Sequence, residues 1–265
     1  FSGALGILSK LDFYKDNINK SRRHFLTPKV FLRHAPGHMR SDALGSERLT
    51  VNNLYEINKS SEIDILEKGT SASLGFDFSI NNLDKNGLIG DEKLKITAGQ
   101  VINLEEDKDM SVKSSMDQRF SDIVGSAMYK VSDNMALNYQ FAVDQNIKQI
   151  NYNEIGLEIE EGKAQFNINY LQEREHIGNE EYIESSIDLN LTSSSELSFA
   201  NKRNLVTESS EFYSLSYNYL NDCLKAGLVY RREFYTDRDI EPENSLMFKI
   251  TLTPLGGLST PGLRK

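Results

Sequence analysis

The sequence contains no tryptophan, one cysteine and no run of about eighteen consecutive apolar residues. The missing apolar run argues against membrane-spanning helices, and the lone Cys223 cannot form a disulfide within the chain. Its thiol is therefore either free or paired with a group outside these 265 residues. Basic residues are outnumbered, 30 against 39 acidic ones, which gives a net charge of −9 and argues against nucleic-acid binding.

Catalytic motifs are also missing. The chain has no Gly-rich phosphate loop, no Ser/His/Asp arrangement at a turn and no credible pair of catalytic carboxylates. His24, His34 and His38 lie near one another in sequence without converging ligands, so we interpret them as part of a solvated loop. The acidic stretches 105–109 and 237–243 offer oxygen ligands for calcium but lack EF-hand spacing, and solvated loops are again favoured. We predict a non-enzyme with no catalytic residue, no metal and no cofactor.

What the sequence does contain is alternation of apolar and polar residues, which predicts β-strands. The clearest example is the segment 209–232, where tyrosine and leucine side chains occupy every second position. The Asn-Asp pair at 221–222 predicts a two-residue hairpin turn, with Leu220 paired to Cys223 across the strands. The faces agree on both sides of this turn.

The same pattern predicts about thirteen strands, each near ten residues long, and no convincing helix. The expected strands cover approximately residues 1–13, 26–32, 70–80, 94–98, 123–131, 135–143, 155–159, 164–170, 183–191, 197–199, 212–220, 223–231 and 246–252. Pro28 lacks an amide hydrogen, which predicts an edge or a bulge there. A slip in the pattern near Gly99 predicts a second bulge. Leu49, Val51 and Tyr55 hint at extended structure in a weakly periodic segment.

Connection lengths alternate along the chain. Tight turns are expected at 132–134, 161–162, 193–195 and 221–222, and most of the connections between them are longer and more charged. Short turns at one end and long polar loops at the other are typical of an antiparallel transmembrane β-barrel. Its apolar face would then contact lipid. The side chains predicted to face lipid are Leu74, Phe76, Phe78, Leu137, Phe166, Ile168, Leu189 and Tyr217. A soluble antiparallel sandwich also alternates and remains the alternative.

Several segments resemble the C-terminal barrel region of the LPS-assembly outer-membrane protein family LptD, also called OstA. They are FLTPKVFLRHAPG at 25–37, the segment 53–78, AGQVI at 98–102, DQRFSDIVG at 117–125 and the segment 221–256. Each is short, and their shared order along the chain carries the resemblance. One departure is that the family often has two adjacent cysteines where this chain has Asp222-Cys223.

The resemblance implies a partial barrel. The family closes an even-stranded barrel of about 26 strands, so about thirteen strands correspond to its second half. Residues 1–265 would then be the C-terminal portion of the barrel, a single domain, with the N-terminal periplasmic domain and the first barrel half absent. The implied location is the outer membrane of a Gram-negative cell. The resemblance also implies that Cys223 forms a disulfide with the N-terminal periplasmic domain, whose compartment is oxidising.

The resemblance further implies transport of lipopolysaccharide (LPS). The intact protein would accept LPS from periplasmic bridge proteins, carry an LptE-type lipoprotein plug, and insert LPS into the outer leaflet through a lateral seam. One side of that seam would be the closing strand, with Leu246, Phe248, Ile250 and Leu252. The alternatives are a generic outer-membrane porin or channel and a soluble all-β binding or adhesive domain. An outer-membrane enzyme is less favoured, because no site for catalysis is found.

Overall fold

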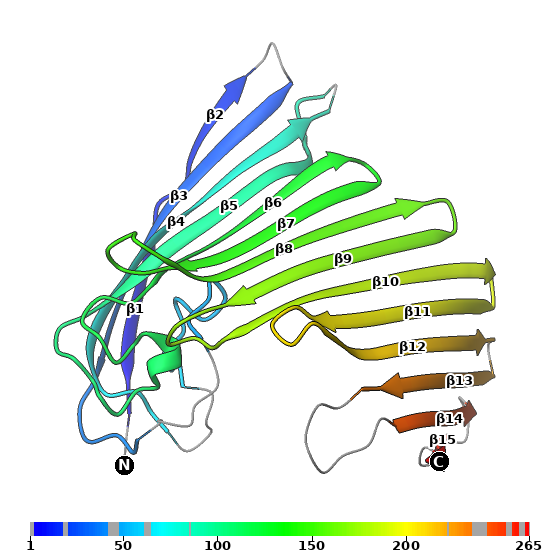
Figure 1. Ribbon diagram of the computed structural model, residues 1–265. Helices are drawn as coiled ribbons and strands as arrows, with labels where there is room; N and C mark the ends of the chain where they lie inside the picture. The colour runs from blue at the N-terminus through cyan, green and yellow to red at the C-terminus, as the bar shows by residue number, and fades with distance from the viewer. Residues whose placement is uncertain are drawn as a thin grey trace. The chain divides into compact units, whose positions relative to one another are not determined.

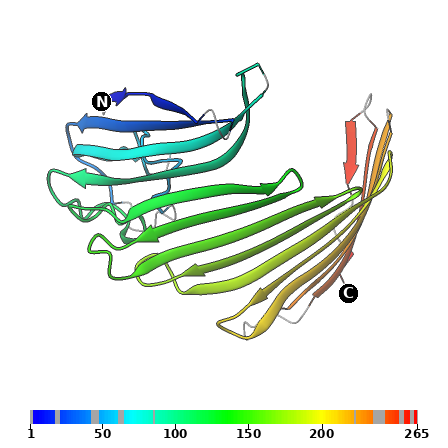
Figure 2. The ribbon, with the colours of Figure 1, turned by 90° about the horizontal axis from the view of Figure 1, so that it is seen from above.

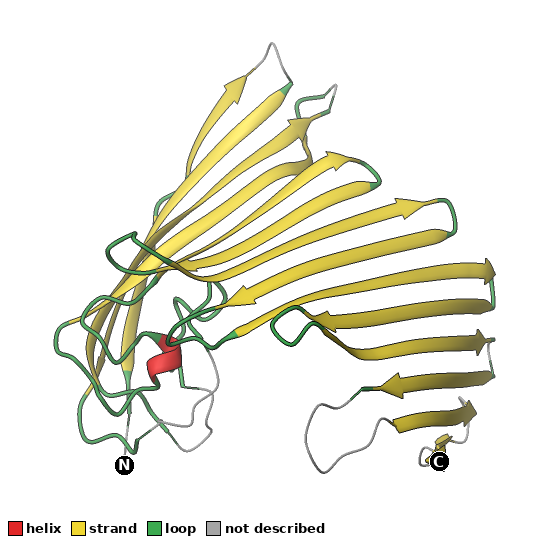
Figure 3. Cartoon of the chain, viewed as in Figure 1, coloured by secondary structure: helices red, strands yellow, loops and turns green. Residues whose placement is uncertain are grey.

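The computed structural model describes residues 3–17, 21–41, 48–60, 65–84, 86–221, 223–234, 243–252, 256–259 and 263–264. Within them the regular secondary structure is almost entirely antiparallel β-sheet (Figure 1). The strands are β1 (Leu5–Lys10), β2 (Phe13–Asn17), β3 (Arg22–Ala35), β4 (Gly69–Leu83), β5 (Ile89–Asn103), β6 (Ile123–Ser132), β7 (Met135–Val143), β8 (Ile150–Glu161), β9 (Ala164–Glu173), β10 (Glu180–Thr192), β11 (Ser195–Asn204), β12 (Ser209–Leu220), β13 (Leu224–Glu233), β14 (Glu243–Leu252), β15 (Gly256–Ser259) and β16 (Leu263–Arg264). A short 3-10 helix, η2 (Val112–Ser114), is red in Figure 3. Within the described ranges, no helix is long and apolar enough to cross a membrane.

The strand order follows the chain. It runs β1-β3-β4-β5-β6-β7-β8-β9-β10-β11-β12-β13-β14-β15, with β2 also beside β3 and β16 beside β14. β1 and β2 together correspond to the predicted first strand, and β3 to β14 to the other twelve, so the all-β antiparallel prediction is confirmed. Alternate connections are short, as at 133–134, 162–163 and 193–194, whereas 36–68 and 104–122 are long. We call these two ends of the strands the tight-turn end and the long-loop end.

The chain divides into two compact units. The first contains Phe1–Val131, Leu137–Ile155 and Gln172–Asn179, and the second contains Ser132–Ala136, Gly156–Leu171 and Glu180–Lys265. The first unit therefore holds β1 to β6 together with the two long loops. The second holds β10 to β16.

In the first unit, strand register separates two faces. Leu32 pairs with Ala72 and Ala72 with Ile102, which places three apolar side chains in one row on what we call the outer face. Ser73 pairs with Val101 on the opposite, inner face, and both are completely buried. Figure 2 shows the strands of this unit running side by side. Alternation thus gives each strand an exposed apolar side and an inner side that is covered near the long-loop end.

The cover consists of residues 48–60 and 65–68 of the first long loop and of the second long loop, 104–122. Leu54 of the first loop is completely buried, and a Cβ atom added to Gly99 of β5 would collide with its side chain. A Cβ atom on Gly75 of β4 would likewise collide with the Tyr55 hydroxyl. Gly75 and Gly99 pair with each other across the strands. This pair of glycines makes room for the loop to lie directly on the sheet.

One sequence prediction was wrong in this region. Leu49 lies in an irregular segment and Val51 and Tyr55 in turns, not extended structure, because the segment is held by its contacts with the sheet. The irregularity predicted near Gly99 occurs on the β6 side of β5, where the register shifts by one residue between the pairs Gly99–Val124 and Ile102–Phe120. The β4–β5 register stays regular from Ser71 to Ile80, and Gly99 also allows the loop to pack closely.

Pro28 lies opposite a break in the neighbouring strand. Lys10, the last residue of β1, pairs with Lys29, and Phe13, the first of β2, pairs with Leu26. The two residues between β1 and β2 therefore face the proline, which has no amide hydrogen to donate. The predicted edge or bulge at Pro28 was wrong, because β3 has neighbours on both sides and the register is the same before and after the break. The missing donor is accommodated by an interruption of the partner strand.

The second unit also has an apolar face across β12, β13 and β14, which we call its outer face. Tyr217 pairs with Leu228 and Leu228 with Phe248, again one row of large apolar side chains. The hairpin between β12 and β13 differs from its prediction, because Leu220 pairs with Lys225 and not with Cys223. The register is shifted by two residues, so every side chain keeps its predicted face.

Candidate functional site

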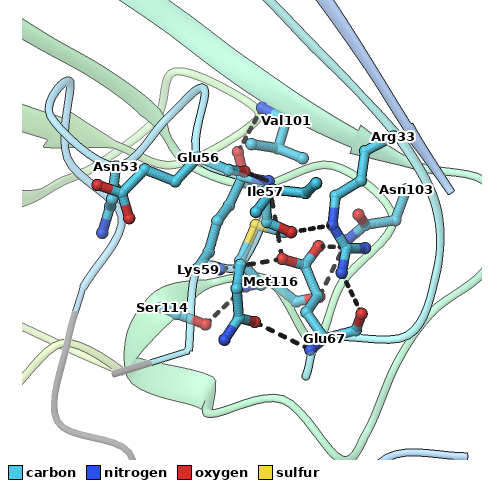
Figure 4. Close-up of polar contacts among 12 residues, drawn as sticks. Arg33, Asn53, Glu56, Ile57, Lys59, Glu67, Val101, Asn103, Ser114 and Met116 are labelled. Carbon is cyan, nitrogen blue, oxygen red and sulfur yellow. Dashed lines mark hydrogen bonds and ion pairs between the residues drawn. The ribbon is translucent and has the colours of Figure 1, made fainter. Parts of the chain in front are cut away.

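A buried ion cluster fixes the first long loop to the inner face of β3. The Arg33 guanidinium donates hydrogen bonds to the carbonyl oxygens of Ile57 and Glu67 (Figure 4). The Glu67 carboxylate lies 3.4 Å from Arg33 Nη1 and 3.7 Å from Lys59 Nζ. All three side chains are almost inaccessible to solvent. Burial lowers the pKa of Lys59, an effect that the nearby Glu67 carboxylate opposes.

Further hydrogen bonds close this loop on itself. Asn58 Nδ2 donates to the Ile65 carbonyl at 2.8 Å, and Asn58 Oδ1 accepts from the Glu67 amide at 3.0 Å. The Lys59 amide donates to the Glu67 carboxylate at 3.3 Å. Two positive side chains therefore share one carboxylate whose remaining hydrogen-bonding capacity is largely used.

The second long loop is held by amide side chains. Asn103, the last residue of β5, donates to the carbonyls of Met116 at 2.9 Å and Gln118 at 2.8 Å. The Val101 amide donates to Ser121 Oγ at 2.9 Å. Figure 4 shows Asn103 and Met116 close to the Arg33 cluster. The first loop is thus bonded to β3 and the second to β5, both at the long-loop end.

Glu173, at the end of β9, joins the two loops within the first unit. Its carboxylate lies 2.6 Å from Arg48 Nη1 of the first loop and 4.0 Å from Lys113 Nζ of the second. The Arg48 guanidinium also lies 3.6 Å from the centre of the Tyr152 ring, a cation–π contact. The loop layer is consequently anchored at β3 and again at β8 and β9.

A smaller polar group includes a titratable histidine. Asp122 Oδ2 accepts a hydrogen bond from Asn151 Nδ2 at 2.9 Å and lies 3.1 Å from His176 Nε2. The hydrogen bond with Asp122 raises the pKa of His176, and the charges of Asp117 and Asp144 add to the effect against its burial. The protonated imidazole therefore attaches the connection 174–179 to the start of β6.

The side chains predicted to face lipid all lie on the outer face of their units. The large apolar side chains among them that are exposed are Leu74, Phe76, Leu137, Phe166, Ile168 and Tyr217, and Phe78 and Leu189 are half-buried. Exposed apolar side chains in such continuous rows are what a lipid-contacting surface requires. Contact of these residues with lipid remains a prediction.

The closing strand and the cysteine occupy defined positions. Leu246, Phe248, Ile250 and Leu252 share the outer face of β14, which pairs with β13 on one edge and with β15 and β16 on the other. Cys223 is exposed in the turn before β13, where its amide donates to Asn221 Oδ1 at 3.0 Å. The seam and the disulfide stay predictions.

Histidine placement required a correction. His24 and His34 lie within β3 and not in a loop, and His34 Nδ1 is 2.8 Å from Thr70 Oγ1. Among the described residues, no group of three or more His, Cys, Asp or Glu side chains is arranged to hold a metal ion. The acidic positions 237–242 lie outside the described residues.

Sequence reasoning missed the Arg33, Lys59 and Glu67 cluster. Arg33 gave a usable signal, because a charged residue at a strand position needs a partner or water. Its partners are 26 and 34 positions away in the sequence and lie in a segment without periodicity, so no local pattern identified them.

Comparisons with known proteins place the chain in a family. The sequence model of LptD, LPS transport system D, matches residues 2–198. No curated protein matches. Among solved structures, a mutant of the Rh. blastica porin is 8% identical with a TM-score of 0.48, covering 94% of this chain and 81% of that chain. A triple mutant of the Rhodopseudomonas blastica porin is 8% identical with a TM-score of 0.47, covering 97% and 83%. The family match spans most of the chain and agrees with the antiparallel barrel-type sheet; the chain belongs to the LptD family of LPS transport in the outer membrane.

Proposed function

We propose that this chain is part of an outer-membrane translocon that inserts LPS into the outer leaflet through a lateral seam of the barrel. The observation that carries the proposal is the LptD family match over residues 2–198. The difference between the two faces of the sheet supports the proposal. The apolar outer face suits contact with lipid, and the polar side chains of the inner face suit contact with a sugar headgroup. The process moves LPS without making or breaking a bond in it.

The loop layer supports a sideways exit. Residues 48–60, 65–68 and 104–122 cover the inner face of β3 to β5 at the long-loop end, and buried ions hold the first two of these segments. Releasing the first long loop exposes buried apolar side chains such as Leu54 and breaks the hydrogen bonds of Arg33 to the loop, which is costly. Parting two strands at a weakly paired seam breaks only ladder hydrogen bonds that water or a new partner replaces. A bulky glycolipid therefore leaves more readily through the seam than through the layer.

Several parts of the chain have separate roles in this translocon. β14 forms one side of the seam at the edge that β15 and β16 pair with in this structure, and the other side belongs to the first half of the barrel. An LptE-type lipoprotein occupies the lumen, and periplasmic bridge proteins deliver LPS to it. Cys223, exposed at the tight-turn end, forms the disulfide with the periplasmic domain. An exposed thiol can reach such a partner without rearrangement of the sheet.

The test locks the seam in cells that carry the whole protein. One cysteine replaces Ser245 of β14 and another is placed in the first strand of the barrel. Oxidation is expected to stop delivery of LPS to the cell surface, measured by surface labelling, and reduction to restore it. Each single-cysteine variant controls for the disulfide of Cys223. Undiminished delivery through the locked barrel would refute the lateral route.

The porin alternative is tested on the purified protein. A diffusion channel predicts ion conductance that addition of the LptE-type lipoprotein leaves unchanged. A plugged translocon predicts conductance that falls when the lipoprotein is added. The soluble-domain alternative predicts a chain that stays folded and monomeric without detergent, which size-exclusion chromatography measures directly.

A further inference from the structure

The second unit contains a groove on the inner face of β12, β13 and β14, strands labelled in Figure 1. Its volume is about 450 Å³. Strand register places Glu196, Asn218, Gly227 and Lys249 in one row across four strands, all on the inner face. Gly227 leaves the middle of the row empty, since a Cβ atom there would lie 3.0 Å from Asn218 Oδ1. The missing side chain of Gly227 therefore creates the hollow, which lies next to the tight-turn end.

The walls of the groove are apolar, unlike the neighbouring inner face. Leu220, Val229 and Met247 all line it, and Leu220 and Met247 are exposed. On the inner face of β9 and β10, polar side chains instead pair with one another, as Asn167 does with Ser186 at 3.2 Å. Exposed apolar side chains on a face that otherwise carries polar groups indicate a surface that a ligand covers.

Two lysines give the groove a positive charge at one side. Lys225 and Lys249 line it, and neither forms an ion pair with another described residue. They are diagonal neighbours on β13 and β14, with backbones roughly 7–8 Å apart. Both flexible ammonium groups can therefore reach one anion. Glu196, the acidic residue of the groove, lies at the opposite end of the row, beyond Asn218 and Gly227.

We propose that this groove binds a phosphorylated acyl glycolipid on its way through the barrel. Its acyl chains lie on Leu220, Val229 and Met247, and its phosphate lies between Lys225 and Lys249. Lysine binds phosphate as a flexible point charge, and an apolar floor beside it matches an amphiphile with an anionic head. The inference rests on the proposed function, because it names the place in this chain where the transported LPS makes contact.

The test uses the whole protein in cells, with a photoreactive amino acid replacing Val229. Illumination is expected to produce a covalent adduct that an antibody against LPS detects. Changing both lysines to glutamine should lower the adduct yield at least about tenfold, since each lost charge-assisted contact weakens binding by about that factor. Changing both to arginine should preserve it. Lys108→Gln, an exposed lysine of the other unit, is the matched control and should have no effect.

A second experiment separates phosphate recognition from nonspecific hydrophobic binding. The purified whole protein is offered a diphosphorylated acyl disaccharide or the same glycolipid without phosphates. The phosphorylated probe should label position 229 and the other should label it at least about tenfold less. Gly227→Leu, which fills the hollow, should reduce labelling by both probes. Gly227→Ala is its smaller control, and heat-modifiable gel migration of both variants checks that the barrel still folds.

Three outcomes overturn the inference. They are an adduct with a protein segment in place of glycolipid, equal labelling by the two probes, or an adduct yield that stays the same when both lysines are changed to glutamine. If any of these occurs while LPS still reaches the cell surface, the subsite is wrong and the translocon proposal stands. If surface delivery of LPS does not depend on the protein at all, the proposed function itself fails.

Discussion

Replacing Glu67 with glutamine tests whether buried charge holds the first long loop on the sheet. The carboxylate lies 3.4 Å from Arg33 and 3.7 Å from Lys59. At an effective dielectric constant of about 20, each attraction amounts to roughly 4–5 kcal/mol. Removing the carboxylate leaves two buried positive groups without a counter-charge, and breaking such a pair typically costs about 3–5 kcal/mol. Burial already lowers the pKa of Lys59, so this side chain can limit the cost by releasing its proton.

Hydrogen exchange on the purified protein measures the effect. A loss of 3–5 kcal/mol in the free energy of local opening speeds exchange of the amides in 48–60 by about two to four orders of magnitude. Glu105→Gln, an exposed change in the other long loop, should leave this exchange unchanged. Adding Lys59→Met to Glu67→Gln removes one stranded cation and should recover part of the protection. Exchange in Glu67→Gln within a few-fold of the wild type would refute the role of the cluster.

Three further predictions follow from the same structure. Because the pKa of His176 is raised above 6.5, its ion pair with Asp122 is complete below pH 6.5 and weakens as the pH rises through the raised value. Amide exchange in 174–179 should therefore speed up over that rise in pH, and Asp122→Asn should abolish this pH dependence. Gly99→Val should destabilise the barrel by about 1–3 kcal/mol, measured by heat-modifiable migration, and unchanged migration would contradict direct loop packing. Phe166→Arg should cost about 2–4 kcal/mol in folding into lipid vesicles and Asn167→Arg far less, so equal costs would disprove the assignment of faces.

The faces of the strands could be predicted from sequence, because alternation depends on neighbours two positions apart. Tyr217 and Phe248 fall on the expected face even though the hairpin between their strands turns one residue later than predicted. An even register shift preserves the side on which each residue lies. This is why the fold class was predictable while the pairing of Leu220 was not.

The loop layer could not be predicted in this way. Leu54 is buried because it meets Gly99, and Arg33 is buried because it meets Glu67, and each contact joins segments that no period connects. Composition suggested solvated loops, since both segments are polar. Tertiary contacts outweigh the tendency of a polar segment to be solvated when its charges are paired and glycines on the sheet leave space for its side chains. The groove on β12 to β14 was missed for a related reason, as it forms only when three strands align.

The order of the strands has a consequence for how this polypeptide tolerates interruption. Each strand hydrogen-bonds mainly to its immediate predecessor and successor, so every β-hairpin carries its own ladder. Severing the backbone between β7 and β8, in the connection 144–149, leaves whole hairpins on either side and removes none of their internal bonds. Two co-expressed pieces divided there should reassemble, because the information for each hairpin is local and only the join between them has to be found again.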